Sequence, residues 1–184
     1  MKILLNLILF QLTWMAAVGG AGQGLWWPGL VMLVVFAGWH LATTPWLRQD
    51  LVLFAGVTLG GFAVDTLLLQ LGVLRYATPV PSAAVAPIWI VVLWAAFALT
   101  LNHSMRFLRG KAALGVLFGL LGGPLAYWVA AKVWGAAEFG MADWQSLLCL
   151  GLAWAILTPL LMAWAVKLVP QIDGAAPAVQ VASA

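Results

Sequence analysis

Three hydrogen-bonding side chains stand side by side near the end of a hydrophobic stretch, in the sequence AAFALTLNHSMRFLR (residues 95–109). They are Asn102, His103 and Ser104, and Arg106 follows them closely. Histidine is the side chain best suited to proton transfer near neutral pH, and an amide or hydroxyl group can orient a polar substrate. Polar groups are costly in apolar surroundings. We therefore expect this cluster to face the inside of a helix bundle, with His103 as general acid or base and Asn102 projecting about 100° away from it along one helix.

Polar side chains in other hydrophobic segments fall at related depths. At 1.5 Å of rise per residue, Asn6, His40 and His103 each lie a few residues from the same expected membrane face. We therefore predict that they converge on a cavity that opens toward the cytoplasm, with Thr100 one turn deeper than His103. The predicted catalytic residues are His103, Asn102 and Asp65, and the predicted substrate-binding residues are Thr100, Ser104, His40, Asn6 and Arg106.

Asp65 is the acidic residue placed deepest within a hydrophobic segment. A charged side chain in mid-membrane costs roughly 3 kcal/mol or more, so its presence needs a reason. One interpretation is a carboxylate that carries a proton, binds a cation or acts as a catalytic acid or base. The other is a protonated side chain that joins two helices by a hydrogen bond. By helix rise Asp65 lies ~10–15 Å beyond the histidines, at the floor of the predicted cavity.

A metal or haem site receives less support from the sequence. His40 and His103 could ligate a haem from facing helices, and Asp50 could complete a metal site with them. However, Asp50 is expected to lie in water, and the chain has one cysteine, Cys149. The sequence contains no phosphate-binding loop, serine-hydrolase elbow or zinc-protease motif. We therefore predict neither a metal ion nor a cofactor.

The composition indicates that the surrounding medium is lipid. Of 184 residues, 65% are hydrophobic and 7% are charged, whereas soluble domains carry about 25% charged residues. The formal net charge of +3 is too small for a nucleic-acid interface. We predict an all-α, polytopic membrane protein with one transmembrane domain over residues 1–170. Residues 171–184 are small and polar, which is typical of a disordered cytoplasmic tail.

Six hydrophobic segments are each near the ~20 residues that cross the hydrocarbon as a helix. They cover residues 3–21, 25–43, 51–75, 87–106, 113–134 and 145–168. A cytoplasmic N-terminus places six basic residues inside and two outside, which by the positive-inside rule puts both termini in the cytoplasm. The inner six are Lys2, Arg48, Arg106, Arg109, Lys111 and Lys167, and the outer two are Arg75 and Lys132. The first segment could instead be a cleaved signal peptide; we expect it to be retained, because Asn6 and Gln11 interrupt its apolar run.

The fifth segment carries a stripe of small residues at spacings of three and four: Gly115, Gly119, Gly122, Ala126 and Ala130. Such stripes let two membrane helices approach closely. A shorter pair, Gly56 and Gly60, lies on the third segment. The two could form one internal contact, or one could serve an oligomer interface or another helix-packing partner.

Several of these motifs resemble a known family. They are Asn6, Gln11 and Trp14, then Asp65 after Gly60-Gly61, then Trp94 and Phe97 before LTLNHS (99–104), and finally GGPLAY (122–127). The chain resembles domain-of-unknown-function family 2878, and the LNHS and GGPLAY blocks are the specific part. The resemblance implies a bacterial inner-membrane location. It also implies lipid chemistry, because such proteins look to be encoded beside fatty-acyl-modifying methyltransferases.

Three functions fit these features. The chain could be an enzyme, or an accessory to one, that acts on a lipid or another hydrophobic molecule. It could be a small proton-coupled transporter that uses Asp65. It could also be a non-catalytic scaffold subunit of a membrane complex that binds partners through its glycine stripe.

Overall fold

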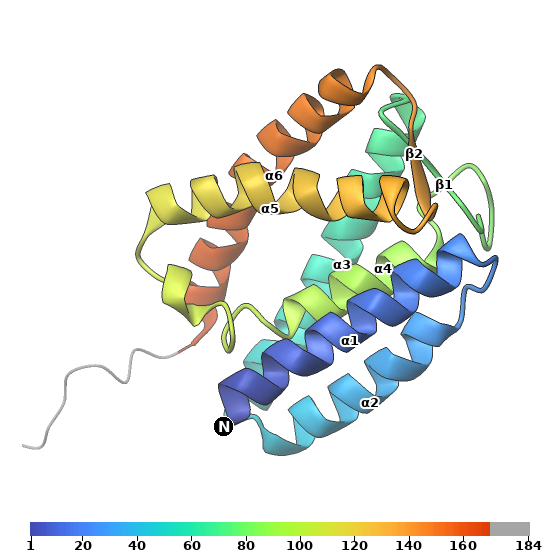
Figure 1. Ribbon diagram of the computed structural model, residues 1–184. Coiled ribbons are helices and arrows are strands. Elements are labelled where there is room, and N and C mark those ends of the chain that lie inside the picture. Colours follow the sequence, from blue (N-terminus) through green and yellow to red (C-terminus); the bar gives the residue numbers. More distant parts are fainter. Residues whose placement is uncertain (170–184) are drawn as a thin grey trace, which may run out of the picture.

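The computed structural model describes residues 1–169, and these form six α-helices (Figure 1). The longest connections are residues 71–87, between α3 and α4, and residues 99–111, between α4 and α5. The expected tail, residues 171–184, lies outside the described residues. The elements in chain order are α1 (Lys2–Gly22), α2 (Pro28–Thr43), α3 (Leu47–Gln70), β1 (Leu74–Tyr76), α4 (Ile88–Ala98), the 3-10 helix η1 (Arg106–Leu108), α5 (Ala112–Lys132), β2 (Ala137–Phe139) and α6 (Asp143–Leu168).

Four of these helices, α1, α3, α5 and α6, are long and apolar enough to cross a membrane. The predicted class, a helical membrane protein, agrees with this. The expectation of about 20 helical residues in every segment is wrong for the other two, because α2 has 16 residues and α4 has 11. The predicted helix over residues 87–106 ends at Ala98, and turns follow it.

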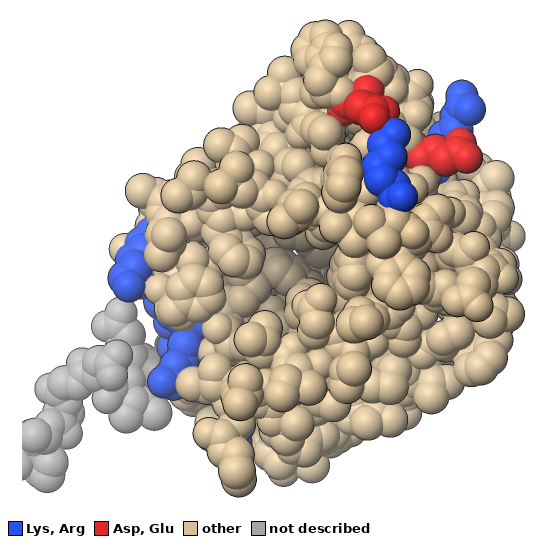
Figure 2. All heavy atoms as spheres, viewed as in Figure 1, with Lys and Arg blue, Asp and Glu red and all other residues tan. Residues whose placement is uncertain are grey.

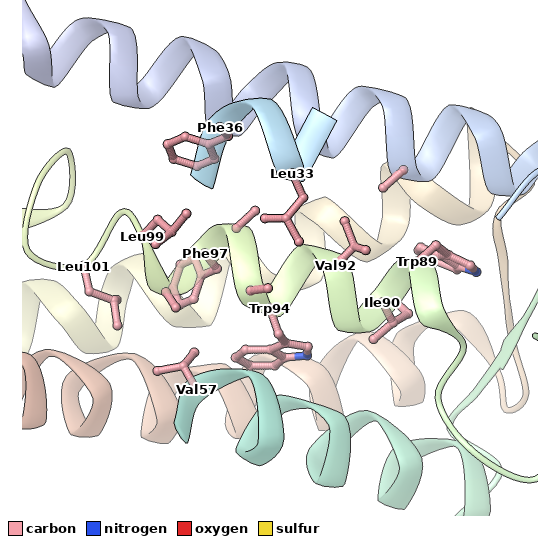
Figure 3. Packing of buried hydrophobic residues seen from close by; sticks show 14 of the residues in the cluster. Leu33, Phe36, Val57, Trp89, Ile90, Val92, Trp94, Phe97, Leu99 and Leu101 are labelled. Atoms are coloured by element: carbon pink, nitrogen blue, oxygen red, sulfur yellow. The ribbon is translucent and has the colours of Figure 1, made fainter. Parts of the chain in front are cut away.

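The core is built around α4. Its sequence, IWIVVLWAAFA, is apolar on every side, and a helix of that kind belongs in the interior of a bundle. Figure 3 shows α4 between its neighbours, with Leu33 and Phe36 of α2 on one side and Val57 of α3 on the other. Because α1, α2 and α3 pack around α4, the residues that follow its early end, 99–102, are buried in protein.

Helices α5 and α6 form a hairpin whose two members pack closely through glycines. A Cβ atom on Gly119 would lie 2.1 Å from the Trp154 carbonyl oxygen, and one on Gly123 would lie 2.3 Å from the Trp154 ring. On α3, Gly56 and Gly61 face Trp164 of α6 and Trp94 of α4 in the same way. These glycines therefore pack within the chain against different partners, whereas a Cβ on Gly60 would meet nothing within 4 Å. A single internal contact between the two stripes, one of the two alternatives, is not formed among the described residues.

Charged residues occupy the two ends of the molecule. At one end β1 pairs with β2 in antiparallel register, which sets Arg75 opposite Glu138, and Lys132 lies 2.7 Å from Asp143. Figure 2 shows blue and red side chains together at this end, and blue side chains without red ones at the left end. The apolar surface between them is the part of the molecule that suits a lipid environment.

Candidate functional site

The most unusual backbone in the bundle is the turn region that follows α4, residues 99–105. Thr100 begins this region: its hydroxyl donates to the Phe97 carbonyl at 2.6 Å, and its own carbonyl accepts from the backbone N–H groups of His103 and Met105. Threonine, asparagine and serine side chains compete with helical hydrogen bonds, which favours an ending here. The turns bring Asn102 and His103 to the bundle end where α1 begins, α2 ends and α3 begins.

Asp50 is the centre of the polar cluster at this end. It lies in the first turn of α3 and is 2% exposed, so the expectation that it lies in water is wrong. Its Oδ2 atom lies 3.0 Å from His40 Nε2 and 2.9 Å from His103 Nε2, and it accepts a 2.6 Å hydrogen bond from the Thr44 hydroxyl. Four donor groups surround this carboxylate, because Asn102 Nδ2 also donates to its Oδ1 at 3.4 Å.

Asn6 fixes the proton positions of His40. Its amide nitrogen donates to the Leu99 carbonyl at 3.0 Å, while its amide oxygen accepts from the Ser104 backbone N–H at 3.4 Å. These two backbone partners fix which end of the Asn6 amide is nitrogen and which is oxygen. The nitrogen, which can only donate, lies 3.2 Å from His40 Nδ1, so Nδ1 accepts from it. A ring nitrogen that accepts carries no proton, so the His40 ring proton is on Nε2 and is donated to Asp50.

His103 is the member of the cluster closest to solvent. Its side chain is 18% exposed, compared with 2% for His40 and for Asp50. The two imidazole rings lie edge to face with their centroids 4.3 Å apart, and Trp46 lies beside His103 at 5.8 Å. Because Asp50 accepts from Nε2 of His103, the second ring nitrogen, Nδ1, is available to bind or exchange a proton. This is the orienting role that an aspartate has beside a catalytic histidine.

Asn102 belongs to the same network as His103. The prediction that Asn102 projects about 100° away from His103 along one helix is wrong, because both side chains contact Asp50. The prediction assumed one continuous helix, whereas these residues lie in turns. The amide oxygen of Asn102 accepts from Arg109 at 2.8 Å, and the Arg109 guanidinium lies over the Trp46 ring at 5.7 Å. Arg109 thus anchors Asn102.

Of the eight predicted site residues, four meet in this cluster: Asn6, His40, Asn102 and His103. Thr100 and Ser104 lie in the turns beside it and line the apolar cavity described below. Arg106 is exposed on η1. Asp65 lies elsewhere, so the structure does not join it to the histidines.

Asp65 forms a second polar cluster in the interior. It is 0% exposed and accepts hydrogen bonds from the hydroxyls of Tyr76 and Tyr127 and from the indole N–H of Trp94. The four residues come from α3, β1, α5 and α4, so this carboxyl joins the α5–α6 hairpin to the rest of the bundle. Burial, with the nearby Asp65 carboxylate, raises the pKa of Tyr76 well above its ordinary value, so Tyr76 remains a donor.

Two cavities lie near the histidine cluster. A small one, about 50 Å³, lies over the rings and is lined by Lys2, Trp39, Thr43 and the two histidines, among others. A large one, about 540 Å³, lies between α1, α4 and the α5–α6 hairpin. Asn6 and His103 line the small cavity, and their chain neighbours Leu7 and Ser104 line the large one. The hydrogen bond from the Ser104 backbone to Asn6 therefore joins a residue that lines the large cavity to one that lines the small cavity.

The same cluster is the place where a metal ion could be held. Within the described residues, His40, Asp50 and His103 each offer one ligand atom, and these atoms lie within 4.8 Å of one another. A metal-bound histidine donates its other ring N–H to a neighbour. His40 instead accepts at Nδ1 from Asn6, so its Nε2 carries a proton where a metal would need a lone pair. The hydrogen bonds therefore favour an acid–base network here.

Sequence reasoning named Asp50 as a possible metal ligand beside the two histidines but left it out of the predicted site, and it missed Thr44 and Arg109. Asp50 had a usable signal: only residues 44–46 separate the end of α2 from the start of α3. So short a connection returns the chain to the same end of the bundle, beside His40. Arg109 gave no such signal, because its contact with Asn102 depends on the turns after α4.

Comparisons with known proteins give a family and no function. Neither a search of the curated proteins nor a search of the solved structures found a match. A family model described as a protein of unknown function (DUF2878) matches residues 3–160. This range covers α1 from its second residue, the next four helices, and α6 as far as Leu160, and it includes every residue of the two polar clusters. The chain therefore belongs to the DUF2878 family, as the LNHS and GGPLAY motifs suggested.

Proposed function

We propose that this chain is a six-span protein of the bacterial inner membrane with both termini in the cytoplasm. The spans α1, α3, α5 and α6 have the length and apolarity for this role. Helices α2 and α4 are shorter, and α4 is continued by the turns of residues 99–105, whose backbone is enclosed by protein. The basic residues Lys2, Arg109 and Lys111 lie at the end that holds the histidines, which makes that end cytoplasmic by the positive-inside rule.

At this end the protein carries out acid–base chemistry on the polar group of a lipid or another hydrophobic molecule, with His103 as the proton-transferring side chain. The observation that carries this proposal is the position of Asp50, which is buried and bonded to both histidines. Asp50 holds the His103 ring so that Nδ1 exchanges the proton. His40, Asn6 and Asn102 are positioning residues, because each acts on the ring through Asp50 or His40.

A purely structural role explains the cluster less well. Removing a carboxylate from water costs several kcal/mol even after relaxation, and apolar residues of similar volume would join α2 to α3 without that cost. A structural cluster would also have no need of a cavity, yet His40 and His103 both line the small one. Lys2 lies at the same cavity, where its ammonium group can pair with an anionic headgroup.

The test is the lipid composition of a strain that lacks the gene, complemented with wild type or with single variants. The proposal predicts that His103→Ala and Asp50→Asn reach the membrane in normal amounts and leave the lipid profile of the deletion strain unchanged. Asp143→Asn is the matched control, because its carboxylate is 56% exposed and pairs with Lys132 at the far end. Full restoration by His103→Ala would refute the proposal.

Proton-coupled transport through Asp65 is the second candidate function. The observation in its favour is that Trp94 and Tyr127, which both bond to Asp65, also line the large cavity. This function predicts uptake or efflux that responds to pH and is lost in Asp65→Asn. It is the less supported of the two, because three donors already satisfy Asp65 and none of the bonded groups connects it to the histidines.

A further inference from the structure

The large cavity is the feature that the acid–base cluster does not explain. It measures about 540 Å³, within the range of small-molecule sites. Its walls are mostly apolar and aromatic, and they come from α1, α4, the turns after α4, η1, α5 and Trp154 of α6. Helix α1 packs against α2 and α4, whereas α5 packs against α6. The cavity therefore lies at the seam between the two halves of the bundle, and Figure 2 shows the hollow on this face, between α5 and α1 as drawn in Figure 1.

The sides of the opening face lipid in a membrane-spanning bundle. Leu7 on α1 and Leu125 on α5 both line the cavity and are 49% and 61% exposed. Phe118, at 42% exposure, continues this apolar rim. The rim is mostly apolar, and Gln11 of α1 is the exposed polar residue on it. A molecule that enters here therefore comes from the hydrocarbon layer.

The dimensions fit one hydrocarbon chain. The cavity runs from Leu7 to Val18 along α1 and from Phe118 to Ala130 along α5, which is roughly 16–18 Å at the helical rise. One leaflet of the hydrocarbon core is about 15 Å thick. The length of the cavity therefore matches that of a lipid chain, and its narrow apolar walls exclude a charged or highly hydrated ligand.

Polar groups line the cavity at Gln11, midway along α1, at the indole N–H of Trp154, which is unpartnered among the described residues, and at one end. Thr100 and Ser104 line that end, and the buried Ser104 hydroxyl has no hydrogen-bond partner within residues 1–169. A buried hydroxyl without a partner costs free energy that a ligand's polar group would recover. At the other end, the polar atoms of Trp94 and Tyr127 are directed to Asp65 and are already bonded.

From these observations we infer that the cavity holds the single hydrocarbon chain of a membrane amphiphile. The chain enters between α1 and α5, and its polar end binds at Thr100 and Ser104. The inference deepens the proposed function and rests on it for the role of His103. It places the polar end at Ser104, whose backbone N–H is hydrogen-bonded to Asn6 of the histidine cluster.

The test uses two photoreactive palmitic acids with purified protein in lipid nanodiscs. One carries its diazirine near the carboxyl group and the other near the methyl end, and mass spectrometry maps the adducts. The first probe is expected to label the segment 100–107, and the second to label the region of Val18, Trp89 and Ala130. Competition by unlabelled palmitic acid or by geranylgeraniol then shows whether the natural chain is an acyl or an isoprenoid chain.

A matched pair of glycine variants makes the test specific. A Cβ on Gly122 would meet only the edge of Phe118, at 3.7 Å, so Gly122→Leu projects into the cavity without displacing α6. A Cβ on Gly60 of α3 meets nothing within 4 Å, and this residue is exposed and outside the cavity. Gly122→Leu should reduce cavity labelling roughly tenfold, equivalent to 1.4 kcal/mol of binding, while Gly60→Leu should match wild type. Ala126→Leu, on the same wall, replaces Gly122→Leu if that variant does not fold.

The outcomes separate this inference from the proposed function. Equal labelling of Gly122→Leu and Gly60→Leu, or adducts confined to lipid-facing residues outside the cavity such as Leu59, would overturn the cavity assignment. His103→Ala should be labelled like wild type, because the chain does not contact the imidazole. Normal labelling of His103→Ala together with full rescue of the lipid profile would support the cavity and contradict the acid–base role.

Discussion

Replacing Asp50 by asparagine removes the charge at the centre of the histidine cluster and changes the size of the side chain very little. The carboxylate now accepts from four donors, three of them at Oδ2: His40 Nε2, His103 Nε2 and the Thr44 hydroxyl. Asparagine can keep its carbonyl oxygen at that position. Its NH₂ group then takes the place of Oδ1 and faces the NH₂ group of Asn102, which lies 3.4 Å from that atom.

The structure sets the size of the expected effect. One buried donor left without an acceptor costs about 1–3 kcal/mol. Three hydrogen bonds change from a charged acceptor to a neutral one, which weakens each by about 1 kcal/mol. Part of this loss is recovered, because the variant no longer buries a charge. We expect a net loss of about 2 kcal/mol, or a melting temperature lower by about 4–8 °C for a chain of this length.

Thermal unfolding of the purified protein in detergent, followed by tryptophan fluorescence, measures this loss. Asp143→Asn is again the control, because its ion pair with Lys132 is solvent-exposed and such pairs contribute about 0–1 kcal/mol. Asp50→Asn should also lose function in the lipid-profile assay, since His103 is no longer held by a charged partner. If Asp50→Asn unfolds at the same temperature as Asp143→Asn and both restore the profile, the buried network has no role and the reasoning fails.

Three further predictions follow from other parts of the molecule. Asp65→Asn leaves a buried hydrogen-bond donor unpaired at the junction of α3, α4 and α5. In the same assay the free energy of unfolding should fall by about 1–3 kcal/mol. An unchanged melting temperature would contradict the role of Asp65 in joining these helices. A Cβ on Gly123 would lie 2.3 Å from the Trp154 ring, so Gly123→Leu should prevent tight α5–α6 packing. This variant should give less monodisperse protein on size-exclusion chromatography, whereas Gly122→Leu should elute like wild type. The topology can be tested in a variant whose single native cysteine is replaced by serine. In it, Glu138→Cys should react with an impermeant maleimide added outside whole cells, whereas Lys111→Cys should react only after permeabilisation. The reverse pattern would invert the proposed topology.

The helical architecture could be predicted from the sequence, because hydrophobic runs of membrane-spanning length leave few other folds possible. All six predicted segments contain a helix. The short strands β1 and β2 could not be predicted, because each has three residues and their pairing depends on two distant loops meeting. The early end of α4 was also missed: the apolar pattern continues past Ala98, and only side-chain competition for backbone hydrogen bonds distinguishes the turns.

The candidate site could be predicted in part. Asn6, His40, Asn102 and His103 were recognisable as polar residues at one depth, and the structure brings them together. Asp50 was missed because its neighbours Arg48 and Gln49 indicate a solvated helix end, whereas the short α2–α3 connection folds that end inward. The prediction that Asp65 lies at the floor of a cavity whose mouth carries the histidines was based on depth alone, and depth does not give the direction in which a side chain points.

The most direct test of the account is the ¹⁵N NMR spectrum of the protein labelled at histidine, since the chain has two histidines, His40 and His103. The account predicts that both rings carry a proton on Nε2, each hydrogen-bonded to Asp50, and that the Nδ1 signal of His40 shifts when Asn6 is replaced by leucine. A His40 ring protonated on Nδ1, or an Nε2 atom bound to a metal ion, would contradict the network on which the proposed chemistry of His103 depends.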